Sequence, residues 1–115
     1  MGLKGSIMPN AARQTDISLN PADAHGCNGC PHAVSGPALT GSGDVIVAGS
    51  PQLRGTGVDN GMHAACCGPN VWFTLQGSGT VMVNDQPAVR MGDMTTHCGG
   101  VGTIISGAGN VIIGG

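Results

Sequence analysis

The sequence predicts an all-β protein built from short strand-turn-strand repeats, and two observations lead to this fold class. Residues 41–54 and 77–90 run in the same register, each with two glycines, an alternating run of valines and a closing arginine. No stretch spaces its apolar residues at the 3.6-residue period of a capped helix. Each copy therefore predicts a strand, a tight turn and a second strand.

A third copy of the repeat is divided between the two ends of the chain. Residues 107–115 repeat the opening half, and residues 11–16 match the closing half at 88–93. The period is about 30 to 36 residues, and a unit of this size must bury its apolar face against its copies. We expect a small pseudo-threefold arrangement of three β-hairpin repeats.

The repeats alternate with segments rich in glycine, proline and polar residues. In chain order we predict a flexible N-terminal arm, a loop, a first hairpin, a second loop, a second hairpin and a third loop. These elements are placed at residues 1–8, 20–32, 44–54, 55–70, 80–90 and 93–102. Because each loop lies between two repeats, the three loops should converge at one end of the molecule.

The amino-acid composition limits the size of the hydrophobic core and the kinds of partner that the protein can bind. The 115 residues form a single domain with one Trp, one Phe and no Tyr, so the core is poor in large side chains and needs a cross-link. Only 9% of residues are charged and the four basic ones are scattered, which argues against nucleic acid as a partner. We expect neither a signal peptide nor a transmembrane segment, because no apolar stretch of the required length is found in the sequence, and we expect the protein to be made and folded in the cytoplasm.

All histidines and cysteines fall in the three predicted loops. They are His25, Cys27, Cys30 and His32 in the first, His63, Cys66 and Cys67 in the second, and His97 and Cys98 in the third. Neutral imidazole and thiolate are the usual ligands of Zn²⁺, so we expect a metal site where the loops meet. Four ligands suffice, and a solvated loop histidine is an equal interpretation of His25.

Other chemistries are weaker interpretations of the same residues. A redox role for Cys27 and Cys30 requires a strand followed by a helix, which the pattern lacks. Hydrolysis by a cysteine and a histidine requires a cleft that mostly small side chains do not offer. Cys66 and Cys67 could form a vicinal disulfide under oxidation, although the cytosol keeps thiols reduced. We therefore expect no enzymatic activity.

Three features together resemble the PAAR-repeat family, named for a Pro-Ala-Ala-Arg motif. They are Pro87-Ala-Val-Arg90 followed by Gly92 and Asp93, the glycine-led valine strands, and the His-Cys-Gly-Gly of residues 97–100. The resemblance implies a conical, non-catalytic all-β protein that caps the trimeric VgrG-like spike of a type VI secretion system, or the related spike of a contractile phage tail. One copy would sit on each trimer, puncture a target membrane, and leave the cytoplasm with the apparatus and its secreted effectors.

The resemblance also implies one structural Zn²⁺ near the apex, held by three histidines and one cysteine. His32 and His63 match the family's first two histidines by their place relative to the repeats, and Cys98 matches its Cys-Gly-Gly. His97 fills the place of the remaining histidine. If His97 and Cys98 cannot both reach the metal, Cys67 becomes the fourth ligand.

The apolar strand residues have two predicted destinations, the core and an apolar face that docks on the spike. They are Val45, Val47, Val81, Val83, Val111 and Ile113. The repeat arginines, Arg13, Arg54 and Arg90, are expected to bind carbonyls or carboxylates such as Asp16 and Asp93, with solvated turn arginines as the alternative. A stand-alone zinc-binding adaptor is the alternative function.

Overall fold

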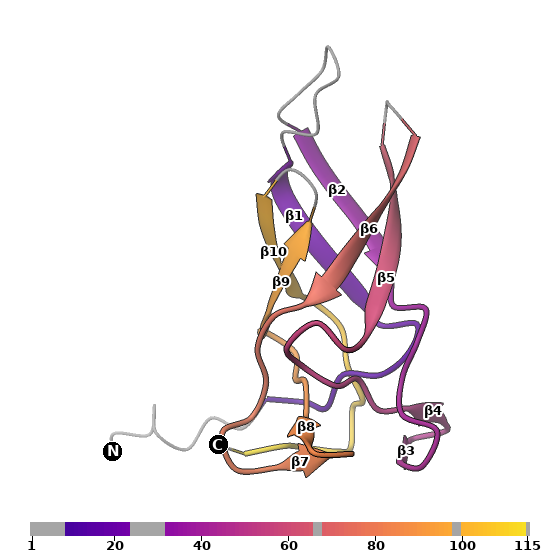
Figure 1. Cartoon of the computed structure of the whole chain (residues 1–115), viewed down its shortest axis with the longest axis vertical. Coiled ribbons are helices and arrows are strands. Elements are labelled where there is room, and N and C mark those ends of the chain that lie inside the picture. Colours follow the sequence, from indigo (N-terminus) through magenta and orange to yellow (C-terminus); the bar gives the residue numbers. More distant parts are fainter. Residues whose placement is uncertain (1–8, 24–31, 66–67, 98–99, 115) are drawn as a thin grey trace.

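All secondary-structure elements in the part that the computed structural model describes, residues 9–23, 32–65, 68–97 and 100–114, are β-strands, joined by loops and turns (Figure 1). The longer strands are β1 (Ile17–Asp23), β2 (His32–Pro37), β5 (Asn60–Ala65), β6 (Gly68–Thr74), β9 (Met94–His97) and β10 (Gly100–Ile104). Two-residue strands form two short ribbons: β3 (Ile46–Val47), β4 (Ser50–Pro51), β7 (Met82–Val83) and β8 (Gln86–Pro87). The predicted all-β class is confirmed. The described residues include no helix, and so none of a length and apolarity that could cross a membrane. The predicted arm, residues 1–8, lies outside them.

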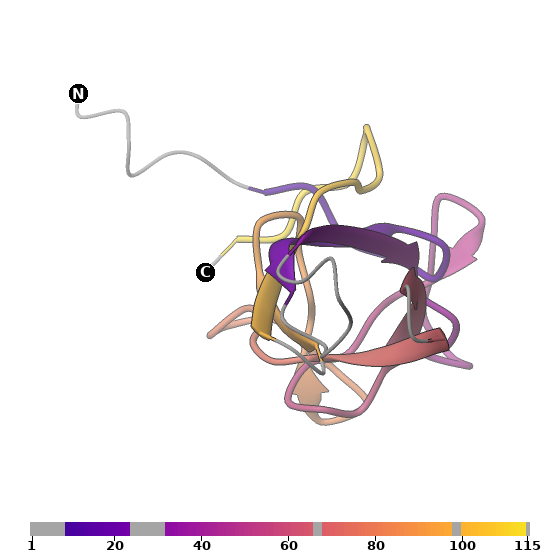
Figure 2. The same cartoon turned by 90° about the horizontal axis from the view of Figure 1, so that it is seen from above.

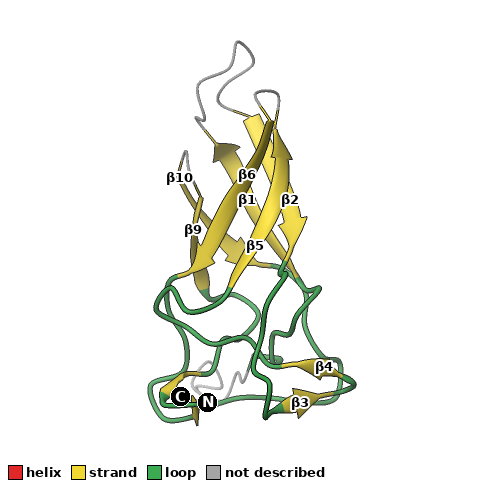
Figure 3. Cartoon of the chain, turned by 45° about the vertical axis from the view of Figure 1, so that its right-hand side comes forward, coloured by secondary structure: helices red, strands yellow, loops and turns green. Residues whose placement is uncertain are grey.

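The six longer strands make one antiparallel sheet that curls until its edges nearly meet. Its order is β2-β1-β10-β9-β6-β5. Three hairpins, β1–β2, β5–β6 and β9–β10, therefore stand side by side and point to the same end of the molecule (Figures 1 and 3). The edge strands approach where Ala38 bridges Gly61 and the Leu39 amide donates to the Asn60 carbonyl at 2.8 Å. Seen from above, the sheet is a ring of strands (Figure 2).

The opposite end of the molecule carries the predicted repeat hairpins, which form the two short ribbons, and we call it the ribbon end. β3 pairs with β4 and β7 with β8. Both turns use residues with positive φ, 48° at Ala48 and 87° at Gly49, and 51° at Asn84 and 65° at Asp85, as two-residue hairpin turns require. The third repeat is assembled from the two ends of the chain, since Asn10 bridges Ile112. The predicted divided copy is confirmed.

A ring of backbone hydrogen bonds joins the three repeats. The Ala12 amide donates to the Val89 carbonyl at 3.0 Å, the Val89 amide to the Leu53 carbonyl at 3.1 Å, and the Leu53 amide to the Ala12 carbonyl at 3.0 Å. All three side chains are fully buried in one core cluster. Each of these residues directly precedes the arginine of its repeat, so the repeats make equivalent contacts around one axis.

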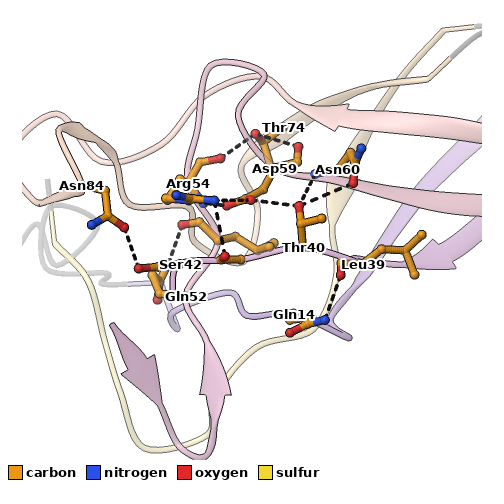
Figure 4. A network of polar contacts seen from close by, with 12 residues as sticks. Gln14, Leu39, Thr40, Ser42, Gln52, Arg54, Asp59, Asn60, Thr74 and Asn84 are labelled. Atoms are coloured by element: carbon orange, nitrogen blue, oxygen red, sulfur yellow. Dashed lines mark hydrogen bonds and ion pairs between the residues drawn. The ribbon is translucent and has the colours of Figure 1, made fainter. Parts of the chain in front are cut away.

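Each repeat arginine binds an aspartate of its own repeat. One carboxylate oxygen accepts from the arginine backbone amide at 2.7 Å and from Nε at 2.9 to 3.1 Å in the pairs Arg13–Asp16, Arg54–Asp59 and Arg90–Asp93. In the middle pair Asp59 is fully buried and also accepts from the Thr40 hydroxyl at 2.8 Å (Figure 4). The expected carboxylate partners at the repeat junctions are confirmed.

Inside the curled sheet, one tryptophan side chain occupies the space beside two glycines that have no side chain. Trp72, Gly36 and Gly102 hold corresponding positions in the second strand of each hairpin, as the strand registers show. Trp72 is fully buried. A Cβ at Gly36 would overlap the Met62 carbonyl, and one at Gly102 would lie 2.7 Å from His97 Nε2. These glycines therefore allow the backbone and the histidine ring to approach closely.

The structure contradicts the prediction that residues 20–32, 55–70 and 93–102 are loops. β1 continues to Asp23, β5 and the start of β6 lie in the second segment, and β9 and part of β10 in the third. The prediction failed because these strands bury polar residues and glycines, whereas the pattern that was sought places apolar residues inward. The expectation that no histidine lies in a strand is also wrong, because His32, His63 and His97 are strand residues.

Five of the six apolar strand residues lie in or against the core, and the docking of exposed apolar residues on a spike stays a prediction. Val83 and Ile113 are buried in a second core cluster with Ala11 and Ala88, the partly buried Val45, Val47 and Val111 contact it, and Val81 is 39% exposed. The most exposed apolar residues of this end are those that directly follow Val45, Val81 and Val111 in the sequence. Ile46, Met82 and Ile112 are 58%, 58% and 56% exposed, and sequence analysis did not name them.

Candidate metal site

Three buried side chains from different hairpins meet inside the sheet. They are Asp23 at the end of β1, His63 in β5 and His97 at the end of β9. Each histidine comes four residues after the aspartate of its repeat's ion pair, and strand alternation turns that position inward. The β1–β2 register shifts between Asn20 and Asp23, and such an irregularity re-aims the side chains that follow it.

The candidate ligand atoms lie within reach of a single ion. His63 Nε2 is 3.7 Å from Asp23 Oδ2, and His97 Nδ1 is 3.9 Å from the same oxygen. The imidazole centroids are 4.7 Å apart, and one ligand atom of each residue lies within 4.8 Å of the others. Tetrahedral Zn²⁺ with bonds of about 2.1 Å holds its ligands about 3.4 Å apart, so each pair of ligand atoms would have to approach by roughly 0.3 to 1.4 Å.

Two hydroxyl groups hold the His97 ring in place. Its Nε2 lies 2.8 Å from Ser18 Oγ and 3.2 Å from Thr95 Oγ1, and the two hydroxyl oxygens are 2.6 Å apart. The indole of Trp72 stacks on the same ring. The other nitrogen, Nδ1, faces Asp23 and makes no hydrogen bond with a described residue. A ring nitrogen in this setting is available to a metal ion, with the hydroxyls fixing the opposite nitrogen.

Burial keeps the His97 imidazole neutral at pH 7. Desolvation is the main cause, and the nearby His63 acts in the same direction while Asp23 opposes both, so that the pKa of His97 is lowered to about 4. Neutral imidazole is the form that binds a metal. Two imidazoles and one carboxylate suit Zn²⁺ and other first-row divalent ions better than Mg²⁺ or Ca²⁺. The group could therefore hold a metal ion of this kind.

The structure brings together two of the predicted ligands, His63 and His97. A third, His32, begins β2, and its Cα is the cross-strand partner of Asp23, so its backbone runs beside the group. Cys98 and its alternative Cys67 lie outside the described residues. The same is true of His25 and of the remaining cysteines, Cys27, Cys30 and Cys66.

Asp23 was not among the predicted ligands. A signal for it exists, because it is the single acidic residue of the His- and Cys-bearing segment 20–32, and carboxylates complete many zinc sites that contain histidine. Comparison with known proteins finds no matching family model and no matching curated protein. Function is therefore inferred from the three repeats and from this buried group.

Proposed function

We propose that this protein is a non-catalytic tip that caps the blunt end of a trimeric, VgrG-like β-helical spike in a type VI secretion system. One copy sits on each trimer and gives it a conical point that punctures the target membrane. The protein leaves the cytoplasm with the spike and with the effectors that the apparatus carries.

The observation that carries the proposal is the ring of backbone hydrogen bonds through Ala12, Leu53 and Val89. One chain that presents three equivalent repeats around an axis can match a partner with three identical chains. At the ribbon end each repeat also exposes at least one large apolar side chain. A threefold partner would meet the same kind of contact three times, and exposed apolar surfaces of this kind favour protein contact.

The end formed by the three long hairpins, β1–β2, β5–β6 and β9–β10, supplies the point of the cone. Asp23, His63 and His97 come from three different hairpins, so one bound Zn²⁺ would cross-link all three where the composition allows no large hydrophobic core. His32, with Cys98 or Cys67, remains the proposed source of further ligands. The metal here has a structural role, since it stabilises the narrow end against mechanical load.

Two alternatives use the same features. The related spike of a contractile phage tail offers the same threefold end and would be capped in the same way. A stand-alone zinc-binding adaptor is favoured by the Asp23, His63 and His97 group alone, because metal binding needs no spike.

Native mass spectrometry of the full chain mixed with a trimeric spike fragment, combined with metal analysis, separates these functions. The tip function predicts one chain and one Zn²⁺ per trimer. Ile46→Lys places a charge on the docking end and should weaken the complex about tenfold. The matched control is Val101→Lys, at a residue 52% exposed on the sheet, which should bind as the parent chain does. A zinc-loaded chain that forms no complex would support the adaptor instead.

A further inference from the structure

The six-stranded sheet is polar inside and apolar outside, the reverse of the usual arrangement in a water-exposed antiparallel sheet. Its buried side chains are mainly polar: Ser18, Asn20, Asp23, His63, Thr74, Thr95 and His97. The large exposed side chains of its described residues are apolar: Met62, Val71, Phe73, Met94 and Val101, which are 37% to 52% exposed. We call these five residues the outer face.

The outer face is continuous over four neighbouring strands. Met62 of β5 is the cross-strand partner of Val71 in β6. Phe73, two residues further along β6, pairs with Thr96 of β9, which in turn pairs with Val101 of β10. Residues two apart on a strand share a face and cross-strand partners lie side by side. One apolar surface therefore covers β5, β6, β9 and β10.

Charge is absent from this surface. Within the described parts of the six strands the one charged residue is Asp23, and it is buried. The other charged residues of the described chain lie outside these strands, before β1 or in the segments β2–β5 and β6–β9: Arg13, Asp16, Asp44, Arg54, Asp59, Asp85, Arg90 and Asp93. The hairpin strands thus present apolar and small polar groups. The three ion pairs lie at the base of the sheet, where each aspartate directly precedes a strand, and Asp44 and Asp85 lie in the ribbons beyond it.

We infer that the outer face enters the hydrocarbon of one leaflet of a lipid bilayer while the ion pairs at the base of the sheet and the ribbon end stay at the membrane surface. The inference rests on the proposed function and deepens it, because it names the surface that meets the membrane. A face without ions avoids the cost of removing charge from water. The nearly closed sheet also leaves few of its backbone groups unpaired in hydrocarbon.

Strand length limits the depth of entry. β6 is one of the longest strands, with seven residues, and at about 3.3 Å per residue it extends roughly 20 Å. The hydrocarbon core of a bilayer is about 30 Å thick. The sheet is long enough for one leaflet and too short to span both, so it acts as a wedge that opens the leaflet it enters.

Flotation of the full chain with vesicles of neutral phosphatidylcholine tests this inference. The parent chain should float with the vesicles, and Phe73→Lys or Val101→Lys should lower its partition about tenfold, because each puts an ion into hydrocarbon. Ile46→Lys is the matched control: it adds the same charge at a residue 58% exposed on the ribbon end and should float as the parent does. Thermal melting of all four chains checks that the substitutions leave the fold intact.

The outcomes separate this inference from the proposed function. Val101→Lys should lose vesicle binding and keep spike binding, and Ile46→Lys should do the reverse. A parent chain that stays in the aqueous phase, or lysine variants that float equally well, would overturn the inference. So would a parent chain that forms dimers without lipid and becomes monomeric in Phe73→Lys, since the outer face would then be an interface between two copies. A chain that floats but binds no spike would leave the lipid contact standing and remove the tip function.

Discussion

The position four residues after each repeat aspartate shows how the first repeat departs from the other two. It holds His63 and His97 in the second and third repeats and Asn20 in the first. The Asn20 side-chain oxygen accepts from the Ala22 amide at 3.1 Å, at the place where the β1 register shifts and Asp23 turns inward. A carboxylate thus joins the two imidazoles where strict repetition would have supplied a third histidine.

Removal of this carboxylate charge tests whether Asp23 binds metal. Asp23→Asn keeps the size of the side chain, and we expect it to weaken Zn²⁺ binding on the order of 100-fold in a competition titration with a chelator, because an anionic ligand is lost. Asp44→Asn is the control, since Asp44 is exposed in the ribbon end. Equal affinities in the two variants would show that the ion is held by other residues.

At the scale of the structural elements, each arginine–aspartate pair joins its repeat to the start of the strand that follows it, β1, β5 or β9. Asp59 immediately precedes β5, and its oxygens accept from the Arg54 backbone amide, from the Arg54 guanidinium and from the Thr40 hydroxyl. The carboxylate is fully buried while the guanidinium is partly exposed. Loss of the charge would leave several donors facing an amide that cannot accept from all of them.

Neutralisation of the buried carboxylate should therefore be costly. We expect Asp59→Asn to lower the free energy of unfolding by about 3 kcal/mol. Asp44→Asn, the same change at an exposed carboxylate that accepts from Asn84 Nδ2, should cost less than about 0.5 kcal/mol. Urea denaturation at pH 7 measures both, and equal losses would contradict the structural role of the buried pair.

The close approach of the sheet edges depends on a glycine. A Cβ at Gly36 would overlap the Met62 backbone, whereas one at Gly43 has nothing within 4 Å. Gly36→Ala should lower the free energy of unfolding by about 3 kcal/mol or more. Gly43→Ala should leave it within about 1 kcal/mol of the parent value. The comparison is made by urea denaturation, and a stable Gly36→Ala chain would mean that β2 and β5 can separate without loss of the fold.

The short ribbons could be predicted from sequence and the long hairpins could not. Residues 44–51 and 80–87 combine an alternating apolar run with residues that accept positive φ, which is the local signal of a hairpin. The long hairpins invert this signal, because His63 and Thr95 face inward and Phe73 and Val101 outward. His63 and His97 were selected by their residue type and by their place relative to the repeats. Asp23 is the single acidic residue of segment 20–32, but it was missed because its inward turn depends on a register shift that no local pattern shows.

At the scale of the whole molecule, the two ends of the chain complete one repeat. The Ala11 amide donates to the Val111 carbonyl at 2.8 Å, and the Ile113 amide donates to the Pro9 carbonyl at 3.0 Å. Ile113 and Ala11 also share the second core cluster. The threefold contacts therefore depend on a pairing between residues at opposite ends of the described chain.

Deletion of residues 107–115 should disrupt more than its own segment. It removes the partners of Pro9 and Ala11 and uncovers the second core cluster, so we expect a loss of at least about 3 kcal/mol of unfolding free energy. Calorimetry would show a lower melting temperature or no cooperative transition. As a control, a circular permutant that joins residue 114 to residue 9 through a short linker and opens at Gly49 should melt cooperatively. A truncated chain that melts like the parent would contradict this dependence.

The pairing of Ala11 with Val111 also sets the order of events during synthesis on the ribosome. The two residues are about 100 positions apart, and closing a loop of that size is slow and costly in chain entropy. At about 5 to 20 residues per second, several seconds pass between the emergence of Ala11 and that of its partner. Through that interval the first strand segment has an unpaired edge and can pair with a neighbouring nascent chain. The fold can thus be completed only after residue 113 has been synthesised. Crowding of nascent chains on polysomes is the condition that most favours misassembly.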